Sequence, residues 1–395
     1  MYQRAQFQEI VNRLNERRKF IQVLAGPRQV GKSTLIAQVM QQISIPYDSH
    51  SSEDTPNATN AWISDVWEAA RSQMDFRKEE EHLLVIDEIQ KMDNWSETIK
   101  KEWDRDTREG RNLKVVLLGS SRLLLKKGLT ESLAGRFEMI RLGHWSYKEM
   151  RDAFGLSLDE YIYFGGYPGS AELIHNEERW QSYVRESLVE SAITKDVLLT
   201  TSINKPSLLR RLFELGCQYS GRELSLTKMM GELQEKGNVT TLANYLHLLD
   251  ECNLLTGLQK YAGDIARKYN STPKFQVYNN ALLNYRNAND FSTERLDAKR
   301  WGRQVESAIG SHLMNHTEQL GYNLYYWRNR DDEVDYILEK SHHLCAIEVK
   351  SGRRTANQGM AKFRQLFHPQ LSLIVGTGGI PVEEFLTMDI RELLQ

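Results

Sequence analysis

The sequence predicts an α/β fold class, with a parallel sheet covered by helices on both faces, then a helical module, then a smaller α/β domain. Three observations support this prediction. Short apolar runs recur in the first third and are separated by helical or polar stretches, as in parallel sheets. Helical periodicity dominates the middle of the chain. Alternation of polar and apolar residues then marks residues 333–350.

The composition limits the classes of function. The 395 residues, 40% of them hydrophobic, are enough for two or three domains, each with its own core. Because the formal net charge is only -2, the chain lacks the general positive field that holds nucleic acid indiscriminately. Any contact with nucleic acid therefore has to come from a local patch.

We expect a cytoplasmic protein with no membrane partner. The cysteines Cys217, Cys252 and Cys345 are far apart and lack metal-ligand spacing, which favours reduced thiols. The segment Met1–Asn15 has no continuous apolar stretch typical of a signal peptide. No run approaches the roughly 20 apolar residues of a membrane span.

The first strong motif lies between an apolar run, Phe20–Ala25, and a segment with helical pattern, Leu35–Gln42. It fits GxxxxGK[ST] in the strand–loop–helix context that this phosphate-binding motif requires. Its glycines let main-chain N–H groups point at phosphate oxygens, and the helix start adds partial positive charge. We expect Lys32 to reach the β- and γ-phosphates of ATP and the Ser33 hydroxyl to bind Mg²⁺. The alternative is a chance glycine turn. The residues predicted to hold the nucleotide are Gly26, Pro27, Arg28, Gln29, Val30, Gly31, Lys32, Ser33 and Thr34.

A second apolar segment, His82–Gln90, ends in two adjacent carboxylates. After a phosphate loop, this is the Walker B pattern of ATPases. Asp87 would complete the Mg²⁺ shell, and Glu88 would orient and polarise the attacking water. Taken without the loop, a strand followed by two solvated acids is a simple alternative.

Two further positions are candidates for contact with the γ-phosphate. The apolar run Leu113–Leu118 is followed by a glycine and two serines, which would lie between the phosphate loop and the Walker B strand. Ser120 and Ser121 are equal candidates for a nucleotide sensor, and a simple turn is the alternative. Arg136 follows a glycine ahead of another short strand and would supply positive charge to the transition state, in cis or in trans. The alternatives are a structural arginine at this position and Arg122 in the same role.

The order of these motifs is similar to a known family. The stretches GPRQVGKST, LLVIDEIQK, LLGSS and SLAGRFE are followed by YFGGYP at Tyr163–Pro168. Over nearly its whole length the chain resembles a large prokaryotic family of AAA-type ATPases whose C-terminal domain is related to the PD-(D/E)XK nucleases. The resemblance implies an AAA-type ATPase domain in residues 1–165, a helical connector with a winged-helix-like module in 166–290, and a nuclease-like domain in 291–395.

The middle module has the element order of a winged helix-turn-helix, with helices expected at 208–219, 226–234 and 240–251 and a hairpin from 254. In a DNA-binding winged helix, the third helix would lie in the major groove. Here that helix contains no lysine or arginine and carries Asp250 and Glu251, so it lacks the phosphate contacts that supply most affinity. An interdomain spacer or an oligomer contact is the favoured interpretation.

The alternating segments in residues 333–350 predict a β-hairpin. With a symmetric turn at Ser341 and His342, Asp335 lies directly opposite Glu348. Lys350 shares their face, because side chains on one face of a strand repeat every second residue. The same face carries Glu333, Ile337 and Ala346, and the opposite, core-forming face carries Val334, Tyr336, Leu338, Cys345, Ile347 and Val349.

Two carboxylates on one patch are the ligands that a hard divalent cation prefers, and such a cation activates water against a phosphodiester. The pattern resembles the PD-(D/E)XK signature without its leading proline, and the resemblance adds Glu306 on a preceding helix. We expect Mg²⁺ or Mn²⁺ at Glu306, Asp335 and Glu348, with Lys350 as a further catalytic residue. Five basic residues and no acid between Lys350 and Gln370 favour a nucleic-acid backbone nearby. The alternative is a hairpin with a merely solvated polar face.

Together these hypotheses describe an ATPase whose nucleotide state regulates metal-dependent cleavage of DNA or, less favoured, of RNA. Arg136 acting in trans would require a homo-oligomer. The rival hypothesis is a signalling or scaffolding ATPase whose C-terminal domain binds nucleic acid or protein partners without cleaving.

Overall fold

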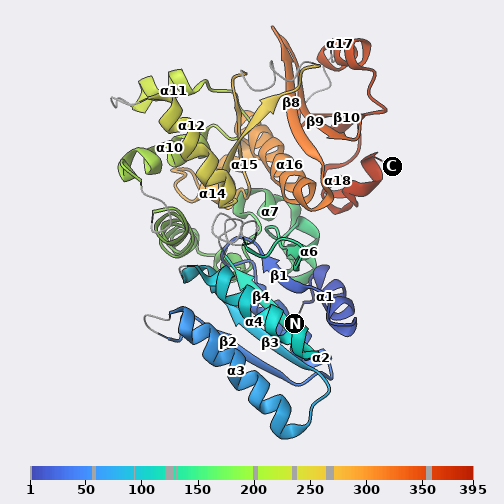
Figure 1. The fold of residues 1–395 in the computed structure, drawn as a ribbon. Coiled ribbons are helices and arrows are strands. Elements are labelled where there is room, and N and C mark those ends of the chain that lie inside the picture. The colour runs from blue at the N-terminus through green and yellow to red at the C-terminus, as the bar shows by residue number, and fades with distance from the viewer. Residues whose placement is uncertain are drawn as a thin grey trace. The chain divides into compact units, whose positions relative to one another are not determined.

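The computed structural model describes residues 2–55, 59–92, 94–120, 129, 132–198, 203–233, 238–263, 271–352 and 358–394. The chain divides into two compact units, Met1–Gly143 and His144–Gln395 (Figure 1). This division differs from the three expected parts, since residues 144–165 belong to the second unit, which also contains the expected connector and C-terminal domain. Within the described residues, no helix is long and apolar enough to cross a membrane.

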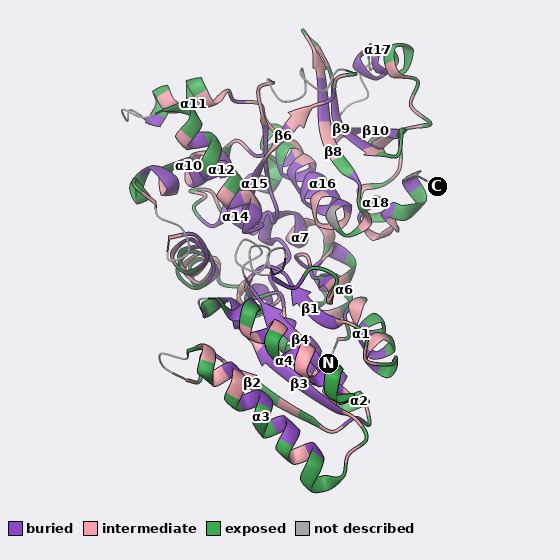
Figure 2. Ribbon diagram, in the orientation of Figure 1, coloured by how far each residue is buried: buried purple, intermediate pink, exposed green. Residues whose placement is uncertain are grey.

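The first unit is built on a five-stranded sheet with the strand order β2-β3-β4-β1-β5. All neighbouring strands are parallel, which confirms the predicted parallel sheet. The central strands β1, β3 and β4 are buried almost throughout (Figure 2). The strands are β1 (Ile21–Ala25), β2 (Tyr47–Ser51), β3 (His82–Asp87), β4 (Leu113–Gly119) and β5 (Phe137–Arg141), and the helices are α1 (Gln6–Asn15), α2 (Lys32–Gln42), α3 (Asn60–Arg77), η1 (Ile89–Lys91) and α4 (Trp95–Glu109).

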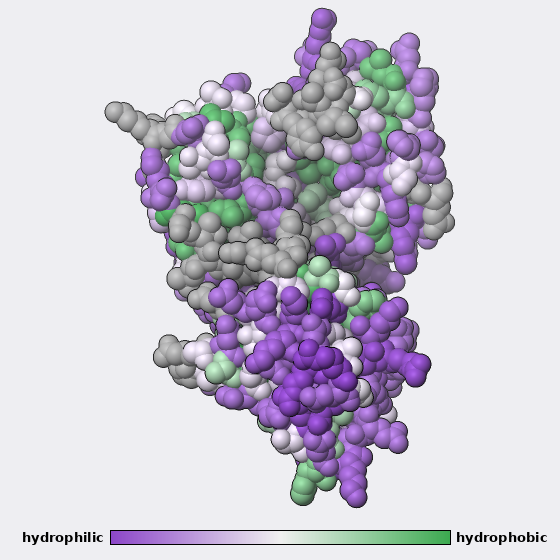
Figure 3. All heavy atoms as spheres, in the orientation of Figure 1, coloured by the Kyte–Doolittle hydropathy of each residue, from purple (hydrophilic) through white to green (hydrophobic). Residues whose placement is uncertain are grey.

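Helices α3 and α4 pack on this sheet through apolar residues such as Trp67, Ile99 and Trp103. Hydrophilic side chains dominate the visible face of the first unit (Figure 3). The helices therefore bury one apolar stripe and expose polar residues, as expected for surface helices of a globular domain.

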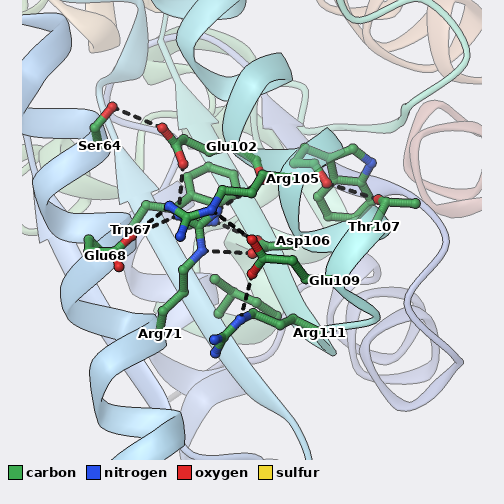
Figure 4. A network of polar contacts seen from close by, with 12 residues as sticks. Ser64, Trp67, Glu68, Arg71, Glu102, Arg105, Asp106, Thr107, Glu109 and Arg111 are labelled. Atoms are coloured by element: carbon green, nitrogen blue, oxygen red, sulfur yellow. Dashed lines mark hydrogen bonds and ion pairs between the residues drawn. The ribbon is translucent and has the colours of Figure 1, made fainter.

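A buried polar network also joins α3 to α4 (Figure 4). Arg71 donates from Nε to Asp106 Oδ1 at 2.7 Å and from Nη1 to Glu102 Oε2 at 2.8 Å. The indole Nε1 of Trp67 donates to the other oxygen of Asp106 at 2.7 Å. Because one guanidinium and two carboxylates are removed from water here, each charge depends on the others for compensation.

The second unit combines helices with a six-stranded sheet of the order β11-β10-β9-β8-β6-β7. The strands are β6 (Leu255–Lys260), β7 (Lys274–Val277), β8 (Asn323–Asn329), β9 (Asp332–Lys340), β10 (His343–Lys350) and β11 (Leu371–Gly376). The longer helices are α6 (Tyr147–Phe154), α7 (Leu158–Phe164), α8 (Glu177–Tyr183), α10 (Pro206–Gln218), α11 (Leu226–Leu233), α12 (Val239–Glu251), α16 (Ala298–Leu320) and α17 (Gln358–Phe367). Shorter helical segments are η2 (Pro168–Leu173), η3 (Val184–Val189), α9 (Glu190–Ala192), η4 (Ile193–Leu198), α14 (Ala281–Asn284), α15 (Phe291–Leu296), α18 (Val382–Thr387) and η5 (Ile390–Leu394).

The winged-helix-like elements occur in the expected order, from α10 through α12 to β6 and β7. Strand β6 pairs antiparallel with β7 and parallel with β8, where Gln259 is opposite Tyr325 and Lys260 is opposite Tyr326. Strands of the expected middle module thus belong to the same sheet as the expected nuclease-like domain. This shared sheet explains why the two fall within one compact unit.

Strands β9 and β10 form the predicted hairpin in the predicted register. Cys345 is paired with Leu338 and Ile347 with Tyr336, as a symmetric turn requires. Ser341 and His342 both have a positive φ, 47° and 74°. Two such residues are typical of the tight turns that join antiparallel strands.

The predicted assignment of the two hairpin faces was wrong in part. Ile337 and Ala346, expected beside the carboxylates, pack with residues of α17 in an apolar cluster. Val334, expected on the opposite face, joins that cluster, because the pairing of β8 with β9 contains a register shift. Tyr336 faces α16 instead and donates its hydroxyl hydrogen to Glu306 O at 2.9 Å. Helices therefore cover both faces.

The YFGGYP segment forms a tight turn after α7. A Cβ at Gly166 would lie 2.1 Å from the carbonyl oxygen of Trp145, a backbone atom that cannot rotate away. The Gly166 N–H donates to Asn279 Oδ1 at 3.0 Å, which fixes the turn close to the start of α14. The glycine is therefore required by close packing inside the second unit.

We expect Gly166→Ala to destabilise the second unit by about 3 kcal/mol, because backbone has to move to admit the methyl group. Urea unfolding followed by circular dichroism would measure the loss. Gly231→Ala is the matched control, because a Cβ there meets no atom within 4 Å. In α11 this change is expected to be neutral or to stabilise by up to about 1 kcal/mol. Equal stability of the two variants would contradict the packing argument.

His312, on α16, is a buried histidine whose two ring nitrogens have no hydrogen-bond partner in the described structure. Its ring centroid lies 4.5 Å from that of His316. Burial lowers the pKa of His312 well below its usual 6.5, and the charge of His316 lowers it further. The folded unit therefore keeps this imidazole neutral at pH values where the unfolded chain protonates it.

The unfolded state binds more protons at this site below about pH 6.5, so the free energy of unfolding should decrease as the pH falls from there. The expected slope is up to about 1.4 kcal/mol per pH unit. Denaturant titrations between pH 7 and 5 should show a shallower loss for His312→Leu than for the wild type. Parallel slopes for His312→Leu and the wild type would rule out this contribution.

Candidate functional site

The phosphate-loop residues run from the end of β1 into the first turn of α2. Gly31 has a φ of 87°, a left-handed conformation that strains a residue with a side chain. Gly26 is required for a different reason, namely lack of space: a Cβ there would lie 2.3 Å from Leu142 O. Gly26 therefore leaves room for the chain segment that follows β5, and Gly31 allows the turn into α2.

Lys32 and Ser33 begin α2 and have separate partners. Lys32 is buried, and its Nζ donates to Gly26 O at 3.0 Å and to Pro27 O at 2.8 Å. Ser33 Oγ donates to Asp87 Oδ2, at the end of β3, at 2.7 Å. An ammonium, a hydroxyl and a carboxylate thus meet beside the loop. These are the groups that hold a triphosphate with its Mg²⁺ ion, so the residues present fit that cofactor.

Glu88 is held by a small hydrogen-bond network. Its Oε2 accepts from Gln90 Nε2 at 2.8 Å and from Ser120 Oγ at 3.1 Å. Arg28 Nη2 of the phosphate loop lies 3.8 Å from the same oxygen. Because β4 lies between β1 and β3, Ser120 occupies the predicted place between the loop and the Walker B strand. The other candidates there, Ser121 and Arg122, lie outside the described residues.

Arg136 is not joined to this group by any contact in the described structure. Its Nε and Nη2 donate to Asp104 Oδ1 at 2.8 Å and Oδ2 at 3.0 Å. The Asp104 hydrogen bonds raise the pKa of Arg136 above its usual value. This two-point ion pair with α4 favours the structural alternative within one chain. A role in trans stays a prediction.

In the second unit, the predicted carboxylates lie at one end of the hairpin. Lys350 Nζ donates to Glu348 Oε1 at 2.5 Å. Asp335 Oδ2 accepts from the Val349 N–H at 2.8 Å, which places Asp335 beside β10 as the register requires. Asp335 and Glu348 are both buried.

A lysine that the sequence analysis missed lies between Glu306 and Asp335. Lys274 is buried, and its Nζ donates to Glu306 Oε1 at 2.6 Å and to Asp335 O at 3.2 Å. The same Nζ lies 3.7 Å from Asp335 Oδ1. Burial raises the pKa of Glu306 to about 7, although Lys274 acts in the opposite direction. Lys274 thus supplies the positive charge that we expected from a metal ion.

The expected metal site is not formed. Among the residues that the structure describes, no group of three His, Cys, Asp or Glu side chains could hold a metal ion. Glu306 and Asp335 share an ammonium, and Glu348 is paired with Lys350. These carboxylates are paired with lysines in the described structure, and their role as ligands of a divalent cation stays a prediction.

Three family models match successive parts of the chain. Residues 18–151 match the model of an AAA domain. The chain carries a P-loop domain of the AAA type. Residues 155–293 and 301–387 match two domains of unknown function, DUF8612 and DUF4143. The AAA match ends near the boundary between the two compact units, and the two other matches lie in the second unit.

Similar proteins occur in bacteria and archaea. The chain is 27% identical over 330 residues to an uncharacterized protein of Mycobacterium tuberculosis, covering 83% of this chain and 69% of that protein. It is 21% identical over 350 residues to one of Haemophilus influenzae, covering 84% and 82%. It is 23% identical over 337 residues to one of Methanocaldococcus jannaschii, covering 80% and 72%.

Solved structures give a weaker likeness. The Holliday junction branch migration motor RuvB of Thermotoga maritima has a TM-score of 0.33 at 14% identity, covering 64% of this chain and 89% of that one. The ORC1 protein of Aeropyrum pernix, in complex with DNA, has a TM-score of 0.33 at 12% identity, covering 75% and 93%. TM-scores of this size do not show a common fold for the whole chain.

Two contacts around Glu88 in the AAA domain were missed by the sequence analysis. Gln90 donates both to Glu88 Oε2 and to Ser120 Oγ, the latter at 3.1 Å. Ser52, after β2, donates to Glu88 O at 2.8 Å. Gln90 belongs to the Walker B segment LLVIDEIQK, so its closeness to Glu88 could be predicted from the sequence. Its link to Ser120 depends on β3 and β4 being neighbours in the sheet.

Proposed function

We propose that the AAA domain binds ATP with Mg²⁺ and hydrolyses it. The observation that carries this proposal is the 2.7 Å hydrogen bond from Ser33 Oγ to Asp87 Oδ2. It brings together the two side chains that would share the Mg²⁺ shell. The Mg²⁺ ion, when bound, neutralises charge on the β- and γ-phosphates.

The remaining side chains have separate tasks in this proposal. Lys32 exchanges the carbonyl oxygens of Gly26 and Pro27 for phosphate oxygens, and the buried position of its ammonium strengthens that contact. Glu88 orients and polarises the attacking water, while Gln90 and Ser120 keep its carboxylate in place. Positioning and electrostatics of this kind account for most of the catalysis in phosphoryl transfer.

The experiment is calorimetric titration with a non-hydrolysable ATP analogue and Mg²⁺, beside an assay of phosphate release from ATP. Lys32→Ala should weaken nucleotide binding at least roughly 100-fold, since it removes the ammonium that contacts the phosphates. Lys91→Ala is the matched control, because Lys91 is a surface lysine of the same unit paired with Glu53. A wild-type chain that binds no adenine nucleotide would overturn the proposal.

For the second unit we propose the non-cleaving alternative, in which it binds nucleic acid or partners without hydrolysing phosphodiester bonds. The supporting observation is Lys274, which donates to Glu306 and contacts Asp335 where cleavage would need a divalent cation. A fixed ammonium neutralises these carboxylates but does not activate water as a metal ion does. Contact with nucleic acid and assembly into a homo-oligomer stay predictions from the sequence.

We expect the wild-type chain not to cleave plasmid or single-stranded DNA with Mg²⁺ or Mn²⁺, with or without ATP. Product lengths on a denaturing gel would measure this. The Asp335→Asn and Glu348→Gln variants are the controls for contaminating nucleases. Cleavage by the wild type that disappears in both variants would restore the hypothesis of a metal-dependent nuclease.

A further inference from the structure

A hollow of about 510 Å³ lies at the start of α16 in the second unit. The end of α10, helices α14 and α15, and the first turns of α16 form its wall, and these elements can be followed in Figure 1. Its volume is within the roughly 300–1,000 Å³ range of small-molecule sites in proteins. The lining is rich in arginine, with Arg222, Arg286, Arg300 and Arg303.

Two of the four arginines are neutralised by carboxylates of the same wall. Arg286 forms an ion pair with Glu214. Arg300 Nη1 lies 3.2 Å from Glu294 Oε1. Glu214 and Glu294 are the acidic side chains among the described residues that line the hollow, so none is left for the other two arginines.

One hydrogen-bond donor of Arg222 has no acceptor among the described residues. Its Nη2 donates to Gln218 O at 2.6 Å, and its guanidinium lies 4.3 Å from the ring centroid of Tyr219. Its Nε, however, is buried and has no hydrogen-bond partner among the described residues. Among the described residues, the Arg222 guanidinium thus forms one hydrogen bond and no ion pair, which leaves most of its five N–H donors for a ligand.

Arg303 brings a second positive charge to the same place. It is exposed on the second turn of α16 and forms no ion pair with a described residue. Burial lowers the pKa of Arg222, and the charge of Arg303 lowers it further, while Tyr219 and Glu232 act in the opposite direction. The two guanidiniums therefore repel each other, and Glu232, which accepts from the Tyr219 hydroxyl at 3.2 Å, offsets only a smaller part of this effect on Arg222. Glu306, which lies next to Gly221, does not compensate them because Lys274 binds its carboxylate.

We propose that this hollow binds a phosphate monoester, with the phosphoryl group held between Arg222 and Arg303. Guanidinium groups match the oxygens of phosphate in geometry and charge. A dianion removes the repulsion between the two arginines and supplies oxygens that accept from their guanidinium N–H groups. The rest of the hollow, lined by Tyr285 and Asn287, holds the organic part of the ligand. This site is separate from the ATP site and does not rest on the proposed ATPase activity.

The test is calorimetric titration of the full chain with inorganic phosphate, in the presence of saturating ADP and Mg²⁺ so that the phosphate loop is filled. We expect one phosphate site, with affinity reduced at least roughly tenfold in Arg222→Gln and in Arg303→Gln. Because Arg303 is exposed and makes no ion pair, Arg303→Gln keeps the fold even if Arg222→Gln does not. Arg295→Gln is the matched control, since Arg295 on α15 pairs with Asp159 outside the hollow.

The same titration in the Lys32→Ala chain separates this proposal from the ATPase proposal, because the site should persist when the phosphate loop no longer binds. Ribose 5-phosphate binding more tightly than inorganic phosphate would indicate a small phosphorylated metabolite. A 5′-phosphorylated oligonucleotide binding where its 5′-hydroxyl counterpart does not would indicate the end of a nucleic acid. Absence of phosphate binding in the presence of ADP, or equal affinity in Arg222→Gln, Arg303→Gln and Arg295→Gln, would overturn the proposal.

Discussion

Glu88→Gln is expected to bind ATP as the wild type does and to hydrolyse it roughly 10²–10³-fold more slowly. The amide keeps the size of the side chain and its hydrogen bond with Ser120 Oγ, which is 3.1 Å from Glu88 Oε2 in the wild type. It loses the negative charge that orients and polarises the attacking water. Phosphate release at saturating ATP, beside a binding titration with the non-hydrolysable analogue, would measure the two effects separately.

Glu53→Gln is the control for this prediction. Glu53 is an exposed carboxylate of the same unit, paired with Lys91, and its removal should leave turnover unchanged. Wild-type turnover in Glu88→Gln would assign the activation of water to another group. Loss of nucleotide binding in that variant would show that Glu88 has a structural task instead.

Arg71→Ala is expected to destabilise the first unit by about 3–5 kcal/mol, a large part of the stability of a domain. The Arg71 side chain is 2% exposed, and its removal leaves the carboxylates of Asp106 and Glu102 buried without their cation. Denaturant unfolding would measure the loss. Hydrogen exchange in peptides from α3 and α4 would assign it to the first unit, because a chain with two units can unfold in steps.

Arg105→Ala is the matched control for Arg71→Ala. Arg105 lies on α4 and forms ion pairs with Glu68 and Glu109, but all three side chains are exposed to water. Exposed pairs of this kind contribute little, so we expect hardly any change in the free energy of unfolding. Equal losses in the two variants would contradict the importance of burial in the Arg71 network.

Local patterns predicted four strands of the first unit, β1, β3, β4 and β5, but not the edge strand β2. Strands β1, β3 and β4 are buried on both faces, and the sequence shows them as mainly apolar runs, interrupted by Gln22 in β1 and by Lys114 in β4. Strand β2 (YDSHS) is an edge strand, and none of its residues is buried. Its polar composition therefore contains no periodic signal that distinguishes it from a loop.

For the hairpin in the second unit, too, local patterns predicted some features but not others. Its register could be predicted, because a symmetric turn and a side-chain period of two residues fix which positions are opposite each other. The burial of both faces could not, because it depends on α16 and α17, which contribute from other parts of the sequence. Likewise, neither the sequence of β6 nor that of β8 contains a pattern that predicts the pairing of Gln259 with Tyr325.

The candidate sites show the same difference between contacts within local motifs and contacts between residues distant in sequence. The phosphate loop and Walker B residues are contiguous motifs, so their types and spacing predicted that Ser33 and Asp87 serve one Mg²⁺ ion, and the structure places the two side chains in contact. Lys274 is one lysine at the start of a short strand, and its partners Glu306 and Asp335 lie 32 and 61 positions away. Arg136 had the right residue type for a finger, but its partner Asp104 could be found only from the packing of α4.

The parallel pairing of β6 with β8 has a practical consequence for dividing the chain into fragments. A cut between residues 293 and 301 would separate these two strands and leave each fragment with an open row of N–H and C=O groups. Open strand edges recruit strands from other molecules, so such fragments would aggregate. A cut between Gly143 and His144 would leave every strand of both sheets with its native neighbours.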